Sequence, residues 1–279
     1  MRVLVTGSKG MLGTDLAKRL NSEGFEVVAY GRDGLNICNL DAVLKAVDGH
    51  RPCVIVNCAA YTDVDGCETN RDEAYRVNSV GPKNLAIASG HYGIPLLHIS
   101  TDYVFDGEAE RPYTEDDTTN PLSVYGSSKL SGELNIKGLT NKYFIIRTQW
   151  LYGHTGKNFV KTMLSLADEK DRLTVVNDQF GSPTFTKDLS VAVCDIIKTN
   201  NYGTYHVTNS GICSWYEFAK SIMLMSGKGS EILPCTSDEF IRPATRPKFS
   251  ALENLNLRLC GFTEMRHYEE ALADVLRGE

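Results

Sequence analysis

Long apolar runs are missing from this chain of 279 residues, and no stretch approaches the roughly 18 residues that a membrane span needs. The chain leads from Met1-Arg2-Val3-Leu4-Val5 directly into a glycine turn, without the basic-then-apolar pattern of a secretory signal. A basic excess is missing too, because 29 Lys and Arg face 35 Asp and Glu, for a net charge of −6. We therefore expect a cytoplasmic protein whose partner is neither a membrane nor a nucleic acid.

Patterns for metal binding and for disulfides are also missing. The eight cysteines are scattered, none forms C-x-x-C, and no His-Cys cluster has zinc-ligand spacing. We expect reduced thiols and no bound metal. With 9 Pro, 42% hydrophobic and 23% charged residues, the composition is that of a globular protein. The length allows one large domain or two of modest size.

Apolar runs alternate with helical patterns over the first 150 residues. Strands are expected near residues 2–6, 26–30, 54–56, 96–99 and 143–146. Helical spacing of apolar residues predicts helices at 11–20, 40–47, 82–92 and 124–137. This alternation predicts an α/β fold with a doubly wound parallel sheet of the Rossmann type.

The alternation of strand and helix patterns becomes less regular after Trp150. Helices are expected at 158–166, 188–197, 215–225 and 268–276, and strands at 173–176 and 204–207. Ser214 and Glu217 form a capping-box pattern that predicts where one of these helices begins. We expect residues 1–150 to form a nucleotide-binding domain to which part of 170–210 returns. Residues 151–279 would then be mainly a smaller substrate-binding part.

A glycine turn separates the first predicted strand from the first predicted helix. It reads Gly7-Ser8-Lys9-Gly10-Met11-Leu12-Gly13, with glycines at Gly7, Gly10 and Gly13. Residues without a Cβ permit a tight turn, and the free N–H groups of the following helix can bind a pyrophosphate. The pattern therefore predicts a dinucleotide site, although its spacing differs from the common G-x-G-x-x-G.

The second strand ends in Tyr30-Gly31-Arg32-Asp33, where many dinucleotide sites have an acid that binds the ribose 2′-hydroxyl. Arg32 would suit a 2′-phosphate, and Lys9 adds positive charge nearby, so we expect a preference for NADPH over NADH. Asp33 argues against this interpretation, and a merely solvated Arg32 is the alternative. The small residues of Asn57-Cys58-Ala59-Ala60-Tyr61-Thr62, after the third strand, either let a flat ligand approach or simply pack the strand end.

Tyr125-Gly126-Ser127-Ser128-Lys129 has the form Y-x-x-x-K within a predicted helix. Residues four apart share one helix face, so Lys129 would lie beside Tyr125. A cation beside a phenol lowers its pKa from about 10 and makes it a usable proton donor. Alone the pattern is common on helix surfaces. Here it follows a glycine turn and a strand that ends in Ser100-Thr101.

In this order the motifs resemble the extended short-chain dehydrogenase/reductases, and within them the dTDP-4-dehydrorhamnose reductases, over nearly the whole chain. The resemblance is carried by six stretches, at residues 57–65, 99–107, 124–129, 147–153, 158–163 and 178–184. These read NCAAYTDVD, ISTDYVFDG, VYGSSK, RTQWLYG, NFVKTM and DQFGSPT. The resemblance implies NAD(P)H-dependent reduction of the C4 ketone of dTDP-4-dehydro-6-deoxy-L-mannose to dTDP-L-rhamnose.

The resemblance also implies roles for individual residues. Thr101, Tyr125 and Lys129 would be catalytic, with Tyr125 protonating the C4 oxygen, Thr101 hydrogen-bonding it and Lys129 holding the nicotinamide ribose. Substrate contacts would include Thr101, Asp102 and Trp150, although Trp150 can also be read as core packing. The resemblance implies cofactor contacts at Gly10, Met11, Leu12, Ala60, Tyr61 and Thr62 and near Asn36 and Ile37. With the residues argued above from their chemistry and with the catalytic pair, the expected cofactor set also includes Gly7, Gly13, Arg32, Cys58, Ala59, Tyr125 and Lys129. Asn36 replaces the acid usual in the family, and Gln149 stands where serine is common.

Several assignments stay open at this point. Asn78 either supports a proton-relay water or is a helix-end amide, and Arg246 either binds the diphosphate or lies on a surface loop. In some relatives magnesium bridges two subunits through carboxylates, and Asp15 lies near one such position, but no metal is predicted here. The protein is expected to be a monomer or a homodimer. A dehydratase or epimerase is disfavoured by Tyr103, where dehydratases have Glu, and a non-catalytic regulatory subunit that keeps the nucleotide site is the remaining alternative.

Overall fold

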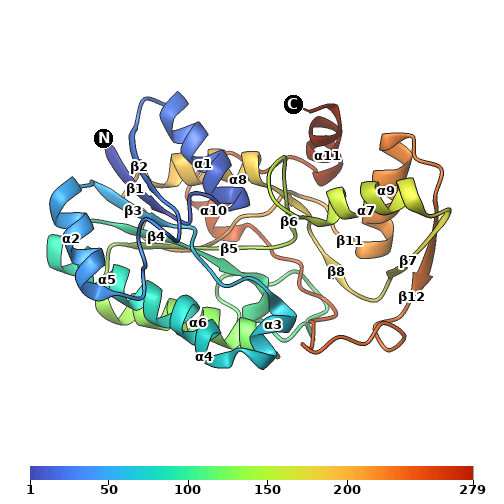
Figure 1. The fold of residues 1–279 in the computed structure, drawn as a ribbon, viewed down its shortest axis with the longest axis horizontal. Coiled ribbons are helices and arrows are strands. Elements are labelled where there is room, and N and C mark those ends of the chain that lie inside the picture. Colours follow the sequence, from blue (N-terminus) through green and yellow to red (C-terminus); the bar gives the residue numbers. More distant parts are fainter. Residues whose placement is uncertain (279) are drawn as a thin grey trace.

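A parallel sheet of six strands forms the centre of the computed structural model, which describes residues 1–278 (Figure 1). The strands lie in the order β10-β5-β4-β3-β1-β2, and every neighbouring pair is parallel. They are β1 (Arg2–Thr6), β2 (Glu26–Tyr30), β3 (Val54–Asn57), β4 (Leu96–Thr101), β5 (Tyr143–Thr148) and β10 (Gly203–His206). The predicted doubly wound parallel sheet is confirmed.

The strands are apolar on both faces because helices cover the sheet on both sides. Val3 and Val5 of β1 pack into one hydrophobic cluster, while Leu4 between them packs into another on the opposite face. Figure 1 shows α1 (Met11–Ser22), α8 (Thr186–Ile196) and α10 (Leu255–Leu259) on the first side. The second side carries α2 (Leu40–His50), α5 (Gly81–Tyr92) and α6 (Val124–Leu139).

A third hydrophobic cluster lies beside the sheet and is built mainly from residues after Trp150. Its helices are α7 (Phe159–Glu169), α9 (Trp215–Ser226) and α11 (Tyr268–Arg277). They pack around short strand pairs formed by β6 (Leu151–Tyr152) with β9 (Thr184–Phe185), β7 (Arg172–Val176) with β12 (Glu231–Cys235), and β8 (Phe180–Gly181) with β11 (Cys213–Ser214). Ser214 and Glu217 make both hydrogen bonds of the predicted capping box.

The short elements between the main strands were not predicted. They are α3 (Val64–Thr69), α4 (Arg71–Tyr75), the π-helix η1 (Arg76–Val80) and the 3₁₀-helix η2 (Asp102–Val104). Most predicted boundaries were within about three residues of those found. The helix expected at 158–166 begins at Phe159, because Asn158 caps it by accepting from the backbone N–H of Lys161, and ends at Glu169.

The strand order places a topological switch between β1 and β3. The chain passes from β1 to β2 on one side and then continues through β3, β4 and β5 on the other. In parallel sheets of this kind ligands bind at the carboxyl ends of the strands, at the switch. Across residues 1–278, none of the helices has the length and apolar character that crossing a membrane requires.

Candidate active site

The glycine turn after β1 leaves no room for side chains. A Cβ on Gly7, whose φ is +68°, would lie 2.5 Å from the backbone nitrogen of Ala59 after β3. A Cβ on Gly13 would lie 2.3 Å from the carbonyl oxygen of Gly7. Gly10 precedes α1, and no side chain caps this end of the helix. The backbone N–H groups of the first helical turn therefore have no capping side chain as a partner. Such an uncapped N-terminus beside close-packed backbone fits a dinucleotide pyrophosphate.

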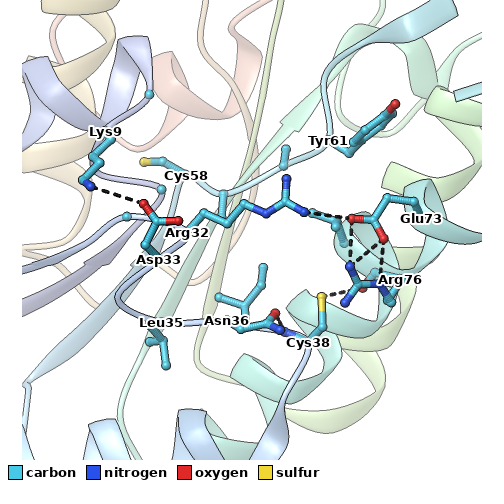
Figure 2. Close-up of a pocket in the computed structure, with 17 residues that line it drawn as sticks. Lys9, Arg32, Asp33, Leu35, Asn36, Cys38, Cys58, Tyr61, Glu73 and Arg76 are labelled. Carbon is cyan, nitrogen blue, oxygen red and sulfur yellow. Dashed lines mark hydrogen bonds and ion pairs between the residues drawn. The ribbon is translucent and has the colours of Figure 1, made fainter. Parts of the chain in front are cut away.

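A cavity opens directly beside this turn (Figure 2). It is lined by the turn, by the loop after β2 and by the segment after β3. Most of the predicted cofactor residues lie around it, namely Gly7, Gly10, Arg32, Asn36, Ile37, Cys58, Ala59, Ala60 and Tyr61. Asn36 accepts a hydrogen bond from the backbone N–H of Cys38, and the carbonyl of Ile37 accepts from Asn84. These bonds fix the loop that forms the cavity's outer wall.

The charged groups at the rim of this cavity are already paired with one another. Arg32, whose side chain is 84% exposed, lies 3.5 Å from Glu73, and Lys9 lies 3.5 Å from Asp33. Glu73 also binds Arg76 through two hydrogen bonds of 2.7 and 2.8 Å. Exposed pairs of this kind are weak, so a phosphate can compete for the cations. Arg76 was missed by the sequence reasoning, because it belongs to a helical stretch that carries no motif.

A second cavity shares Gly10, Cys58 and Ala60 with the first and so continues from it. It lies at the carboxyl ends of β4 and β5. It brings together most of the remaining predicted residues, namely Met11, Leu12, Gly13, Thr62, Thr101, Asp102, Tyr125, Lys129 and Trp150. The glycine turn and the three expected catalytic residues therefore border one continuous space.

Thr101 is the last residue of β4, and Tyr125 lies in the first turn of α6, which Ser123 caps. Burial raises the pKa of Tyr125 above its usual value, while a hydrogen bond with Thr101 acts in the opposite direction. The prediction that Lys129 lowers the pKa of Tyr125 is wrong for this structure. Desolvation dominates, and the Nζ of Lys129 contacts Ile99 and His98 instead. The phenol therefore keeps its proton at neutral pH, as a proton donor must.

Lys129 is 1% exposed and reaches across to β4. Its Nζ donates to the carbonyl of Ile99 over 2.6 Å and lies 3.2 Å from His98 Nε2. Burial lowers the pKa of Lys129 to about 8, against the opposing charge of Glu133. Glu133 itself is fully buried and forms an ion pair of 2.8 Å with Arg147 on β5. His98 carries no recognisable motif, and only its position on β4 links it to the site.

The expected substrate residues Thr101, Asp102 and Trp150 all line the second cavity. Asp102 is 2% exposed and accepts from the hydroxyl of Thr101 over 2.9 Å, and burial raises its pKa to about 6. Trp150 has a left-handed backbone, with φ of +48°, and stacks on Trp215 with ring centroids 3.6 Å apart. Trp215 was missed, although its place directly after the Ser214 cap marked it as a helix-start residue. Its ring turns toward Trp150 and the cavity.

Three further residues have defined partners. Asn78 lies in η1 and is fully buried, and its amide bonds both backbone groups of Tyr61 and the hydroxyl of Ser128. Arg246 forms two hydrogen bonds of 3.1 Å with Asp65 of α3 and has a side chain that is 18% exposed, so it is an anchored residue rather than a free surface arginine.

Asp15, the carboxylate near a magnesium position of some relatives, accepts a hydrogen bond of 2.5 Å from Thr186. Over residues 1–278, His, Cys, Asp and Glu side chains form no group of three or more that could hold a metal ion.

A Rossmann-type sheet whose glycine turn opens onto a tyrosine and a lysine one helical turn apart defines an extended short-chain dehydrogenase/reductase. The chain belongs to the family described as the RmlD substrate binding domain, whose model matches residues 1–279.

Individual relatives match along almost their whole length. The chain is 45% identical to the spore coat polysaccharide biosynthesis protein SpsK of Bacillus subtilis, covering 99% of this chain and 97% of that protein. It is 41% identical to a dTDP-4-dehydrorhamnose reductase of Streptomyces griseus, covering 98% and 92%. The structure matches that of the dTDP-4-dehydrorhamnose reductase of Bacillus anthracis in complex with NADP, with a TM-score of 0.98, 45% identity and coverage of 100% and 99%.

Proposed function

We propose that this protein reduces the C4 ketone of dTDP-4-dehydro-6-deoxy-L-mannose, with NADPH or NADH as hydride donor, and releases dTDP-L-rhamnose. The observation that carries the proposal is the continuous space bordered by the glycine turn and by Thr101, Tyr125 and Lys129. The bound nicotinamide nucleotide supplies the hydride. The names of the S. griseus and B. anthracis relatives support this choice of substrate and cofactor.

Residues of the protein then protonate the C4 oxygen and stabilise the negative charge that forms on it. As the C4 oxygen becomes negative, Tyr125 gives it a proton, which its raised pKa keeps available at neutral pH. The hydroxyl of Thr101, which donates to Asp102 in the cofactor-free protein, turns its single proton to the same oxygen when the sugar is bound. Lys129 binds the nicotinamide ribose and stabilises the phenolate that Tyr125 leaves. Trp150, backed by Trp215, forms a flat wall for the sugar.

The cofactor part of the proposal rests on the first cavity. Gly7, Gly10 and Gly13 receive the pyrophosphate at the start of α1, and Arg32 with Lys9 favours a 2′-phosphate. We further propose that residues 1–150, with the returning segment within 170–210, bind the cofactor, and that residues 151–279 mainly bind the sugar nucleotide. A monomer or homodimer in the cytoplasm is part of the same proposal.

The test is oxidation of NADPH, followed by its absorbance, after addition of the enzymatically prepared 4-keto sugar nucleotide. We expect turnover with the L-manno compound and slower turnover with other dTDP-4-keto hexoses, each tried with NADPH and NADH. Absence of turnover with every sugar, while NADPH still binds, would contradict the proposal and favour a regulatory subunit. Faster turnover of another 4-keto hexose would contradict the substrate assignment alone.

A further inference from the structure

A buried chain of hydrogen bonds lies behind Lys129, and the steps above do not use it. The hydroxyl of Thr6 donates to Asn57 Oδ1 over 2.6 Å, and Asn57 Nδ2 lies 2.8 Å from His98 Nδ1. His98 Nε2 then lies 3.2 Å from Lys129 Nζ. All four residues are at most 1% exposed. The chain connects the end of β1 through β3 and β4 to the lysine on α6.

One backbone contact fixes the donors and acceptors in this row of hydrogen bonds. Asn57 Oδ1 also accepts from the backbone N–H of Ala59 over 3.1 Å, and a backbone N–H can only donate. The amide nitrogen of Asn57 must therefore face His98, and it donates to Nδ1. Burial lowers the pKa of His98 well below its usual value, so the ring is neutral. Its single proton then sits on Nε2.

The N–H of His98 thus points at the nitrogen of Lys129. An ammonium group has donors only, so a charged Lys129 would set two donors against each other. A neutral amine has a lone pair that accepts from Nε2–H, and it still donates to the carbonyl of Ile99. The neutral form of Lys129 is the one that satisfies both contacts.

We propose that His98 is a positioning residue that favours the neutral amine of Lys129 in the cofactor-free protein, so that at alkaline pH binding of NADPH is coupled to uptake of one proton by Lys129. The coupling follows because the ribose oxygens assigned to Lys129 accept hydrogen bonds from an ammonium, and the negative pyrophosphate at the glycine turn borders the same cavity, so both favour the charged form of Lys129. This half of the inference rests on the proposed function, whereas the state of His98 and Lys129 in the free protein does not.

Among the titratable groups around Lys129, none but Lys129 itself is expected to change its charge between about pH 7 and pH 9. Burial raises the pKa of Cys58 to about 12 and also raises that of Tyr125, while the pKa of His98 is lowered. Glu133 has a lowered pKa because of its pairing with Arg147, so it stays charged. Burial brings the pKa of Lys129 to about 8, inside this window.

The first test is isothermal titration calorimetry of NADPH binding to the full chain in two buffers of different ionisation enthalpy, without any sugar. We expect uptake of about one proton near pH 9 and almost none near pH 7, a pH that also lies above the second pKa of about 6 of a phosphate monoester such as the 2′-phosphate of NADPH. In His98→Gln the side-chain oxygen can accept from an ammonium, so the uptake profile should move to higher pH by about one unit. His206→Gln is the matched control, because His206 is equally buried but bonds the carbonyl of Tyr113, and its profile should stay where it is.

No proton uptake at any pH, or identical profiles for His98→Gln and the unmodified chain, would overturn the coupling. The second test is nitrogen-15 NMR of the cofactor-free chain, which distinguishes the two tautomers of a neutral histidine. We expect the signal of His98 to report a proton on Nε2. A proton on Nδ1 would overturn the inference without bearing on the reductase activity, whereas failure to bind NADPH would defeat the proposed function and leave the NMR result standing.

Discussion

Arg32 extends from the loop after β2 across the rim of the cofactor cavity, where it meets Glu73 (Figure 2). Glu73 also accepts two hydrogen bonds from Arg76. The carboxylate of Glu73 would therefore stay paired if Arg32 moved from it to a phosphate. On the proposal that Arg32 binds the 2′-phosphate of NADPH, the weak exposed pair with Glu73 is the position of its guanidinium before the cofactor binds.

Replacing Arg32 by Ala should weaken NADPH binding by on the order of tenfold and leave NADH binding nearly unchanged, because a charge-assisted phosphate contact is lost. Fluorescence titration of both cofactors measures this. Arg71→Ala serves as a control, since Arg71 is an exposed arginine of α4 that does not line the cavity. Equal losses for the two cofactors would mean that Arg32 does not contact the 2′-phosphate.

Single residues also mark the limit of what spacing predicts. The i,i+4 pattern correctly placed Tyr125 and Lys129 on one face of α6 and in one cavity. The pattern could not predict that Lys129 on α6 contacts Ile99 and His98, because those two residues belong to strand β4. The predicted lowering of the pKa of Tyr125 was therefore wrong, because burial raises it. Desolvation depends on the whole fold and is not encoded in a local pattern.

Among the elements, the turn that joins β5 to β6 shapes the substrate side of the cavity. Trp150 sits in this turn in a left-handed conformation that an L-residue adopts only at a cost of about 1–2 kcal/mol. Stacking on Trp215 at the start of α9 contributes about 0.5–1.5 kcal/mol in return. The turn and α9 thereby hold one ring in a fixed orientation at the mouth of the site.

Trp150→Gly should raise KM for the sugar nucleotide by roughly tenfold, because the flat wall is lost. NADPH affinity should stay within about twofold of its original value. Glycine is preferable to alanine for this test, since it adopts a φ of +48° without strain. The comparison is Trp215→Ala, which loses the same stack but keeps the ring of Trp150. If both variants raise KM equally and lower the melting temperature equally, Trp150 acts through packing alone.

Helices and strands were predicted correctly where the spacing of apolar residues and the length of the segment indicated the same element. The strands β1, β3, β4 and β5 are almost entirely buried and read as continuous apolar runs, and the partly exposed edge strand β2 still has the apolar pair Val27-Val28, so β1 to β5 were all found. The short elements α3, α4 and η1 were missed, because each has only five or six residues and takes its shape from tertiary contacts. Asn78 is an example, since its amide inside η1 bonds the backbone of Tyr61 and the hydroxyl of Ser128, far away in the sequence.

At the scale of the whole molecule, the strand order explains why one site serves both cofactor and substrate. The switch between β1 and β3 opens the sheet at its carboxyl edge, and Gly7, Cys58 and Thr101 follow three neighbouring strands there. The cluster formed mainly by residues after Trp150 then closes the far side of the cavity with Trp215. The sequence order predicted this sheet, but the pairing of β6 with β9 and of β7 with β12 depends on contacts that no local pattern encodes.

The central claim is that Tyr125 protonates the C4 oxygen of a sugar nucleotide in this shared cavity. Tyr125→Phe keeps the ring, including its edge-to-face contact with Tyr103, and removes only the acidic group. Tyr103→Phe removes a neighbouring hydroxyl in the same cavity and is the matched comparison.

The decisive measurement is kcat for NADPH-dependent reduction of the 4-keto sugar nucleotide by the unmodified chain and by these two variants, together with NADPH affinity by fluorescence titration. Our account predicts that Tyr125→Phe lowers kcat by about 10²–10⁴ while NADPH affinity stays within about twofold, and that Tyr103→Phe loses far less. Near-full turnover by Tyr125→Phe would contradict the account, because another group would then have to protonate the sugar.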